Sequence, residues 1–199
     1  SLSLRAVEVE GATGGVRCVG GCRGRLEGSV VAQGRGAGVL VGEGSRLEAR
    51  DNLVSRWEQC FVANAGAELV LDDNATAFCE LESVAAVSAR LEVRGHLHSG
   101  PSRTAGITVL GGRALVEESA LLAPGPVGLM VRGGRTEARG LLVRGARADA
   151  DGTFGDGVFA ISQESLRLEQ PLLEANEGAG LTVQHGPVLA LGLESQANT

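Results

Sequence analysis

The residues best suited to chemistry are three aspartates, Asp51, Asp72 and Asp73, which recur with arginines at a fixed spacing. Asp73 follows Asp51 by 22 positions, and Asp72 lies 22 positions from both Arg50 and Arg94. If residues at this spacing stack, Asp51 lies directly under Asp73, with Arg94 beside the pair. Carboxylate pairs serve as general acid and base, and arginine binds anionic groups. The catalytic candidates are therefore Asp51, Asp72, Asp73 and Arg94.

A repeat along the whole chain supports this stacking. Apolar or small pairs begin 21 to 23 residues apart, with one step of 30. These pairs are Leu26/Gly28, Leu47/Ala49, Leu69/Leu71, Leu91/Val93, Ala114/Val116, Thr136/Ala138, Leu166/Leu168 and Leu189/Leu191. A fixed period in this range indicates a solenoid. Apolar positions alternate with a period of two and are soon interrupted by glycine, which predicts short strands and not helices.

The repeat resembles the right-handed parallel β-helix of the pectin-lyase-like superfold, especially its repeat-only bacterial members. We therefore expect an all-β solenoid, a single domain over residues 1–199 with about eight coils of 21–24 residues and one longer coil. Leucine-rich repeats have a similar length but need an asparagine ladder, for which only Asn52, Asn74 and Asn176 are available. The resemblance implies carbohydrate-acting enzymes as one class of function, and it assigns no reaction.

Composition narrows the possible functions. Aromatic residues make up 3% of the chain and glycine 31 of 199 residues, which fits a narrow core of small aliphatic side chains. The net charge of −6 argues against nucleic acid as a partner. No apolar run is long enough to span a membrane, and no signal peptide is evident. Because neither end has an amphipathic cap, we expect a segment of a longer or processed protein, whose remainder continues at the ends.

The four cysteines indicate two possible disulfides. Cys18 and Cys22 flank a glycine-rich turn that is two residues longer than its equivalent in the next coil, so a bridge there would close a bulge. Cys60 and Cys79 open and end one coil and form the second candidate pair; buried free thiols are the alternative. Four cysteines favour an oxidising location: extracellular, cell surface or periplasmic.

The charged residues follow the same period. One set alternates in sign over six coils and consists of Arg50, Asp72, Arg94, Glu117, Arg139 and Glu169. A second pattern, Arg-x-Glu, begins at Arg25, Arg46, Arg90 and Arg135. Neighbouring opposite charges fix strand register and keep the surface soluble. The functional alternative is that Arg90, Arg113 and Arg135 bind an acidic glycan.

Two further groups are candidate metal ligands. His96 and His98 flank Leu97, which the repeat places inside, so we expect both histidines to face solvent; two histidines alone make a poor metal site. Asp149, Asp151 and Asp156 fall in the longest coil, where oxygen ligands for Ca²⁺ would gather on an inserted loop. A solvated loop is the alternative, and we expect no cofactor.

These patterns favour a non-catalytic secreted or cell-surface scaffold or binding module, with a polysaccharide or another surface protein as partner. The alternative is a polysaccharide lyase or glycoside hydrolase. It would be centred on the stacked aspartates, although no aromatic residue is predicted there to stack on a sugar.

Overall fold

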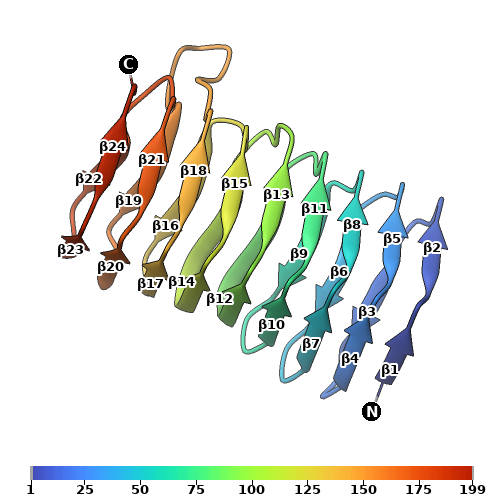
Figure 1. Ribbon diagram of the computed structural model, residues 1–199. Helices are drawn as coiled ribbons and strands as arrows, with labels where there is room; N and C mark the ends of the chain where they lie inside the picture. Colours follow the sequence, from blue (N-terminus) through green and yellow to red (C-terminus); the bar gives the residue numbers. More distant parts are fainter. Residues whose placement is uncertain (1, 199) are drawn as a thin grey trace.

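The computed structural model describes residues 2–198, which form one continuous parallel β-solenoid (Figure 1). Each turn contributes one strand to a nine-stranded sheet, so the solenoid has about nine turns. The expected all-β parallel β-helix is thus confirmed, with one turn more than the eight expected. The additional turn contains the strands within Leu2–Glu10, which precede the first of the eight expected pairs. The described residues contain no helix long and apolar enough to cross a membrane.

Each turn has three sides. The first face consists of β3 (Val16–Cys18), β6 (Ala37–Val41), β9 (Gln59–Ala63), β16 (Val127–Arg132), β19 (Asp156–Ile161), β22 (Leu181–Gln184) and the first halves of β12 (Glu82–Arg94) and β14 (Ala105–Glu117). The charged face consists of β1 (Leu2–Arg5), β4 (Arg23–Glu27), β7 (Arg46–Arg50), β10 (Glu68–Asp72), the second halves of β12 and β14, β17 (Arg135–Arg139), β20 (Ser165–Glu169) and β23 (Val188–Leu191).

The third side, the apolar face, is the nine-stranded sheet. It consists of β2 (Glu8–Glu10), β5 (Val30–Ala32), β8 (Leu53–Ser55), β11 (Ala75–Ala77), β13 (Leu97–Ser99), β15 (Ala120–Leu122), β18 (Leu142–Arg144), β21 (Leu172–Glu174) and β24 (Glu194–Gln196). Because each strand has only three residues, only its middle side chain points into the solenoid.

The core is a stack of equivalent aliphatic residues. Leu69 lies in register between Leu47 and Leu91, and all three are almost completely buried. Trp57 is the largest buried side chain, and its indole nitrogen donates a hydrogen bond of 3.1 Å to the Val31 carbonyl. This small-residue core matches the composition, because a narrow cylinder has little room for aromatic rings.

The register differs from the expected one at both ends of the solenoid. At the start, Gly24 and Leu26 pair with Leu47 and Ala49, so Gly28 is not an inward position. The Arg-x-Glu pattern was misleading there, because Arg25 pairs with Glu48 and not with Arg46. In a parallel ladder, a shift of two residues keeps the same face but changes every cross-strand partner.

At the other end, the inward residues are Val188 and Ala190, which pair with Leu166 and Leu168. The expected pair, Leu189/Leu191, is exposed. Four successive apolar residues in β23 give no alternation from which the face can be read, and a shift of one residue exchanges the two faces.

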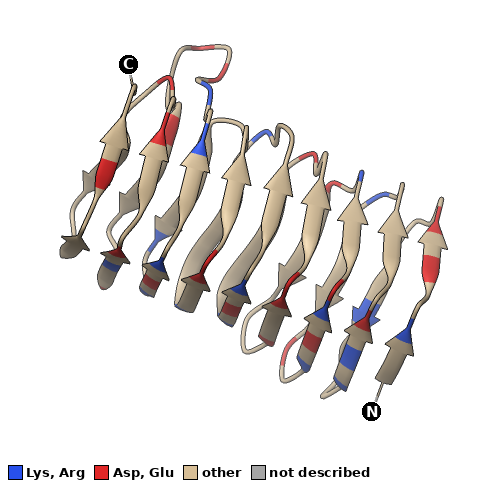
Figure 2. Ribbon diagram, in the orientation of Figure 1, with Lys and Arg blue, Asp and Glu red and all other residues tan. Residues whose placement is uncertain are grey.

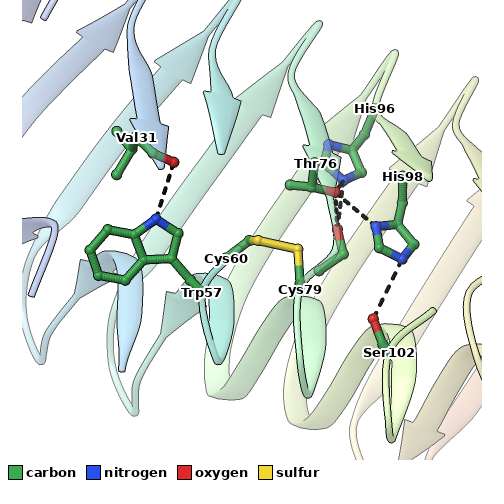
Figure 3. Close-up of a disulfide and its surroundings, with 9 residues drawn as sticks. Val31, Trp57, Cys60, Thr76, Cys79, His96, His98 and Ser102 are labelled. Atoms are coloured by element: carbon green, nitrogen blue, oxygen red, sulfur yellow. Dashed lines mark hydrogen bonds between the residues drawn. A yellow bond between two sulfur atoms is a disulfide. The ribbon is translucent and has the colours of Figure 1, made fainter. Parts of the chain in front are cut away.

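Both candidate disulfides are present. Cys18 is bonded to Cys22 across the glycine-rich turn, and Cys60 is bonded to Cys79, with Cα atoms 5.2 Å and 5.7 Å apart. Both pairs join residues of a single turn, so they hold turns closed and do not link successive turns. Figure 3 shows the Cys60–Cys79 bridge beside a cluster of buried polar side chains.

Candidate functional site

The charged face carries a column of outward residues whose sign alternates at every turn, and we call it the alternating column. Its members are Arg5, Glu27, Arg50, Asp72, Arg94, Glu117, Arg139 and Glu169. The nitrogen–oxygen distances are 2.9 Å for Arg5–Glu27, 2.7 Å for Arg50–Asp72 and 3.0 Å for Arg94–Glu117. The expected stacking of six charges is therefore present, and it extends over two further turns.

Two of the four catalytic candidates are engaged in this column. Asp72 forms an ion pair with Arg50, and Arg94 pairs with Glu117 and with Glu92 of its own strand. A hydrogen bond to Glu117 is the main reason why the pKa of Arg94 is raised. These partners neutralise Asp72 and Arg94, which leaves less charge for a substrate.

Asp51 and Asp73 stack at the corner between the charged and apolar faces, as expected. Both adopt positive φ angles, 55° and 52°, at the turn between the two sheets. The Asp73 carboxylate lies over Gly95, where an added Cβ would be 2.2 Å from its Oδ1. A shallow depression of about 370 Å³ on the charged face is lined by Arg50 and Asp72, and neither Asp51 nor Asp73 lines it. Both aspartates are exposed at the edge of the face, outside this depression.

A second column on the charged face contains three arginines in succession, Arg90, Arg113 and Arg135, which we call the arginine run. They are direct neighbours on β12, β14 and β17, and all three are exposed. Arg90 has a long contact of 3.6 Å with Glu68, and Arg135 pairs with Glu164 at 3.1 Å. Within the described residues, Arg113 has no ion-pair partner.

The surroundings of Arg113 explain why it is unpaired. In the middle column of the charged face, the residue beside it is Leu115, whereas the turns on either side have Glu92 and Glu137. Glu92 is paired with Arg94. Glu137 is paired with Arg139 and Arg167. The nearby carboxylates are therefore committed to other arginines, and the arginine run keeps a net positive charge.

Like charges on adjacent strands are unfavourable. The alternating column lies only four residues further along the same strands, so a run of one sign is a local departure from the pattern of this face. Such departures are typical of functional sites. Guanidinium groups in a row are suited to bidentate contact with carboxylate or sulfate groups.

The three aspartates of the long coil do not converge. Asp149 accepts hydrogen bonds from the Thr153 hydroxyl and amide at 2.7 Å and 2.9 Å, which lower its pKa. Asp156 is buried and accepts a hydrogen bond of 2.8 Å from the Ala179 amide. Among residues 2–198, no three His, Cys, Asp or Glu side chains are grouped as a metal site. Asp149 instead organises its own loop, together with Asp151, whose amide it also binds.

The expectation that both histidines face solvent is wrong: His96 and His98 are almost completely buried. It is Leu97 that points outward, 43% exposed, in register with Leu53 and Ala75 through β11. The prediction placed the apolar residue inside and the polar ones outside. On this side of the solenoid the arrangement is the opposite: polar side chains point into the interior, and a column of apolar side chains faces solvent.

The buried histidines join a hydrogen-bonded chain of hydroxyl groups (Figure 3). His96 Nε2 lies 2.9 Å from Ser83 Oγ, which lies 2.6 Å from Thr76 Oγ1. Thr76 Oγ1 lies 3.0 Å from His98 Nδ1, and His98 Nε2 lies 3.4 Å from Ser102 Oγ. Each contact has one donor and one acceptor if both rings are neutral with the proton on Nε2.

Burial is the main reason why the pKa of His96 falls to about 3 and that of His98 to about 4. The cluster is enclosed, so it is a structural feature and not an accessible site. Its signal in the sequence was the 22-residue spacing of His96 and His98 from Asn74 and Thr76, which are also polar and also buried.

Comparison with known proteins leaves the function open. No protein-family model and no curated protein matches the chain. Among solved structures, an alginate lyase from Paenibacillus sp. str. FPU-7 is similar over 99% of this chain and 92% of its own, with a TM-score of 0.43 and 11% sequence identity. A likeness of this degree carries no information about activity, so the function must be argued from the residues themselves.

Proposed function

We propose that this protein is a non-catalytic extracellular or cell-surface module that binds an acidic polysaccharide through the arginine run. The observation that carries the proposal is Arg113, an exposed arginine without an ion-pair partner in the described residues, between two further arginines. A polymer with a carboxylate or sulfate on successive sugars would supply the missing negative charges. The two disulfides are consistent with an oxidising location.

The shape of the face also favours a polymer over a small molecule. The arginines lie on successive parallel strands, spaced about 4.8 Å apart along the solenoid axis. A chain laid along that axis would contact all three, whereas a small anion would contact one or two. The protein has a net charge of −6, so attraction for anions is restricted to this strip. A duplex nucleic acid needs a broader basic surface and is therefore less suitable.

The test is binding of labelled polygalacturonate and heparin, with neutral dextran as the comparison polymer. We expect both acidic polymers to bind, with an affinity that falls as salt is added, and dextran not to bind. Arg113→Glu should weaken binding at least about ten-fold, because it places a negative charge in the centre of the run.

Arg103→Glu is the matched control. Arg103 is also exposed and pairs with Glu80 at 3.2 Å, away from the run, and its reversal changes the net charge equally. Equal weakening by both variants would mean that only overall charge matters and would overturn the proposal. Unchanged binding by Arg113→Glu would also overturn it. Shortening of either polymer that is lost in Asp73→Asn would establish an enzyme instead.

A further inference from the structure

The arginine run occupies three successive turns, and a carboxylate lies at each end of it. Charges of both signs are frequent on the strands of the charged face (Figure 2). In the column that contains the run, the residue before Arg90 is Glu68. After Arg135 the column continues with Ser165, whose neighbour in the chain, Glu164, pairs with Arg135 at 3.1 Å. The cationic surface is therefore limited to three turns.

The two end carboxylates hold the outer arginines and leave the centre of the run free. Glu68 is shared between Arg46 at 3.0 Å and Arg90 at 3.6 Å, on the turn before the run. Glu164 lies on the turn after the run. Arg113 is two turns from each of them and keeps its full charge. The same carboxylates mark the places where an anionic ligand would begin to meet repulsion.

The corner between the first face and the charged face is also different in these three turns. In each of them three residues separate the last inward residue of the first face from the arginine, namely residues 87–89, 110–112 and 132–134. In the turn before and the turn after, the corner has four residues, 64–67 and 161–164. β12 and β14 continue round the corner as unbroken strands, whereas a loop joins β9 to β10 (Figure 1).

The short corners bring no competing charge next to the arginines. The two residues before each arginine of the run are no larger than serine: Ser88 and Ala89, Gly111 and Gly112, and Gly133 and Gly134. The corner of the following turn has one residue more, and it contains Glu164. On this flank the three guanidinium groups are therefore free of carboxylates from their own turns, and the longer corner supplies the carboxylate that ends the run.

We propose that the arginine run is a site of fixed length, which binds three consecutive acidic sugars, one at each arginine. This inference rests on the proposed function, because it concerns the length and charge spacing of the same ligand. Successive strands are about 4.8 Å apart, so the anionic groups of the ligand must recur at about that distance. A linear chain with a carboxylate or sulfate on every sugar can supply this spacing, whereas a chain with one on every second sugar leaves an arginine unmatched.

The end carboxylates turn this length into a limit. A fourth acidic sugar beyond Arg90 would lie beside Glu68, and one beyond Arg135 would lie beside Glu164. Like charges on adjacent strands repel each other, so the added acidic group gains no favourable contact. Each sugar beyond the third therefore contributes little affinity, although a longer chain still binds through any three of its sugars.

Calorimetric titration with oligogalacturonates of one to six sugars measures this limit. Affinity should rise at least about ten-fold from one sugar to three and change less than about two-fold from three to four. Hyaluronate oligomers, which are acidic on every second sugar, should bind at least about five-fold more weakly at equal length. Arg113→Glu should weaken binding of the three-sugar oligomer at least about ten-fold, as for the polymer.

Glu164→Gln tests whether this carboxylate sets the end of the site. Without its charge, four sugars should bind at least about five-fold more tightly than three. Glu80→Gln is the matched control, because Glu80 is an exposed carboxylate that pairs with Arg103 at 3.2 Å, away from the run. It should leave both affinities unchanged. Both are exposed substitutions, and equal thermal midpoints would show that the variants remain folded.

The possible failures of the length limit and of the proposed function can be told apart. An affinity that keeps rising beyond three sugars in the wild type would overturn the length limit alone, and so would hyaluronate oligomers that bind equally well. Equal tightening of three and four sugars by Glu164→Gln would also overturn it, because the carboxylate would then act only through Arg135. Oligomers that do not bind, or that bind Arg113→Glu as well as the wild type, would overturn both.

Discussion

Two polar columns lie on opposite sides of the same corner of the solenoid, and they contribute to the stability of the fold in different ways. The alternating column is outside, where arginines and carboxylates pair in contact with water. The inner column is buried and consists of Ser29, Asn52, Asn74, His96 and Ser119. Both repeat once per turn. The alternating column is held by ion pairs in contact with water. The inner column is held by buried hydrogen bonds that water cannot replace.

The inner column shows why burial matters more than charge. Asn74 donates hydrogen bonds from Nδ2 to the carbonyls of Ala49 and Asp72, at 2.8 Å and 3.1 Å. Its Oδ1 accepts bonds from the amide and side chain of Asn52. These groups have no alternative partner if the side chain is removed. An exposed arginine that loses its carboxylate is simply solvated.

The largest expected effect comes from acid acting on the inner column and its neighbours. His96 and His98 have folded-state pKa values below the ordinary 6.5, so the unfolded chain binds more protons as the pH falls below 6.5. Stability is therefore complete above that pH and is lost on acidification towards pH 4. Each histidine should cost about 2 kcal/mol between pH 7 and pH 5.

Urea unfolding at several pH values measures this effect. Replacing His185 by Asn is the control, because it removes one exposed histidine and leaves the buried pair intact. His98→Asn should remove roughly half of the pH dependence. A wild-type stability that is flat from pH 7 to pH 5 would contradict the assignment of both histidines as buried and neutral.

The second effect concerns the asparagines. Asn74→Ala should lower the free energy of unfolding by about 3 kcal/mol, because it leaves buried donors of Asn52 and the Ala49 carbonyl without partners. Chemical denaturation at neutral pH gives the value. A loss no larger than that from an exposed substitution would show that the inner column contributes little, and the contrast between the two columns would fail.

The smallest effect is expected in the alternating column. Arg94→Ala removes ion pairs to Glu92 and Glu117, but both partners retain water and Arg94 is half exposed. We expect a change in thermal midpoint far below that of Asn74→Ala, and smaller still in concentrated salt. A loss comparable to that of Asn74→Ala, persisting in salt, would show that the outer charges are a main source of stability.

The arginine run shows what the outer charges do when alternation stops. In the alternating column each charge lies beside opposite charges on the neighbouring turns, so the column as a whole is neutral. At Arg113 the pattern places like charges together and a leucine where a glutamate would stand. The same period therefore produces a neutral strip and a cationic strip on one face, and only the second is suited to an anionic ligand.

The sequence by itself determined the period, the strand character and the stacking of charges. Apolar residues alternating at period two and repeated every 22 residues or so admit few folds other than a parallel solenoid. The same spacing placed Asp51 under Asp73 and aligned Arg90 with Arg113, because residues one repeat apart occupy equivalent positions on adjacent turns of a solenoid. The two cysteine pairs followed from turn length and position.

Only the tertiary structure decided which way each side chain faces. Leu97 looked like core and is exposed, and its neighbouring histidines looked exposed and are buried, because three-residue strands point only one side chain inward. The register at β23 was equally undetermined, since four apolar residues in a row fit either face. Whether a side chain is buried depends on the residues that pack against it from the other faces of the solenoid. The sequence indicates the inward face only where polar and apolar residues alternate cleanly.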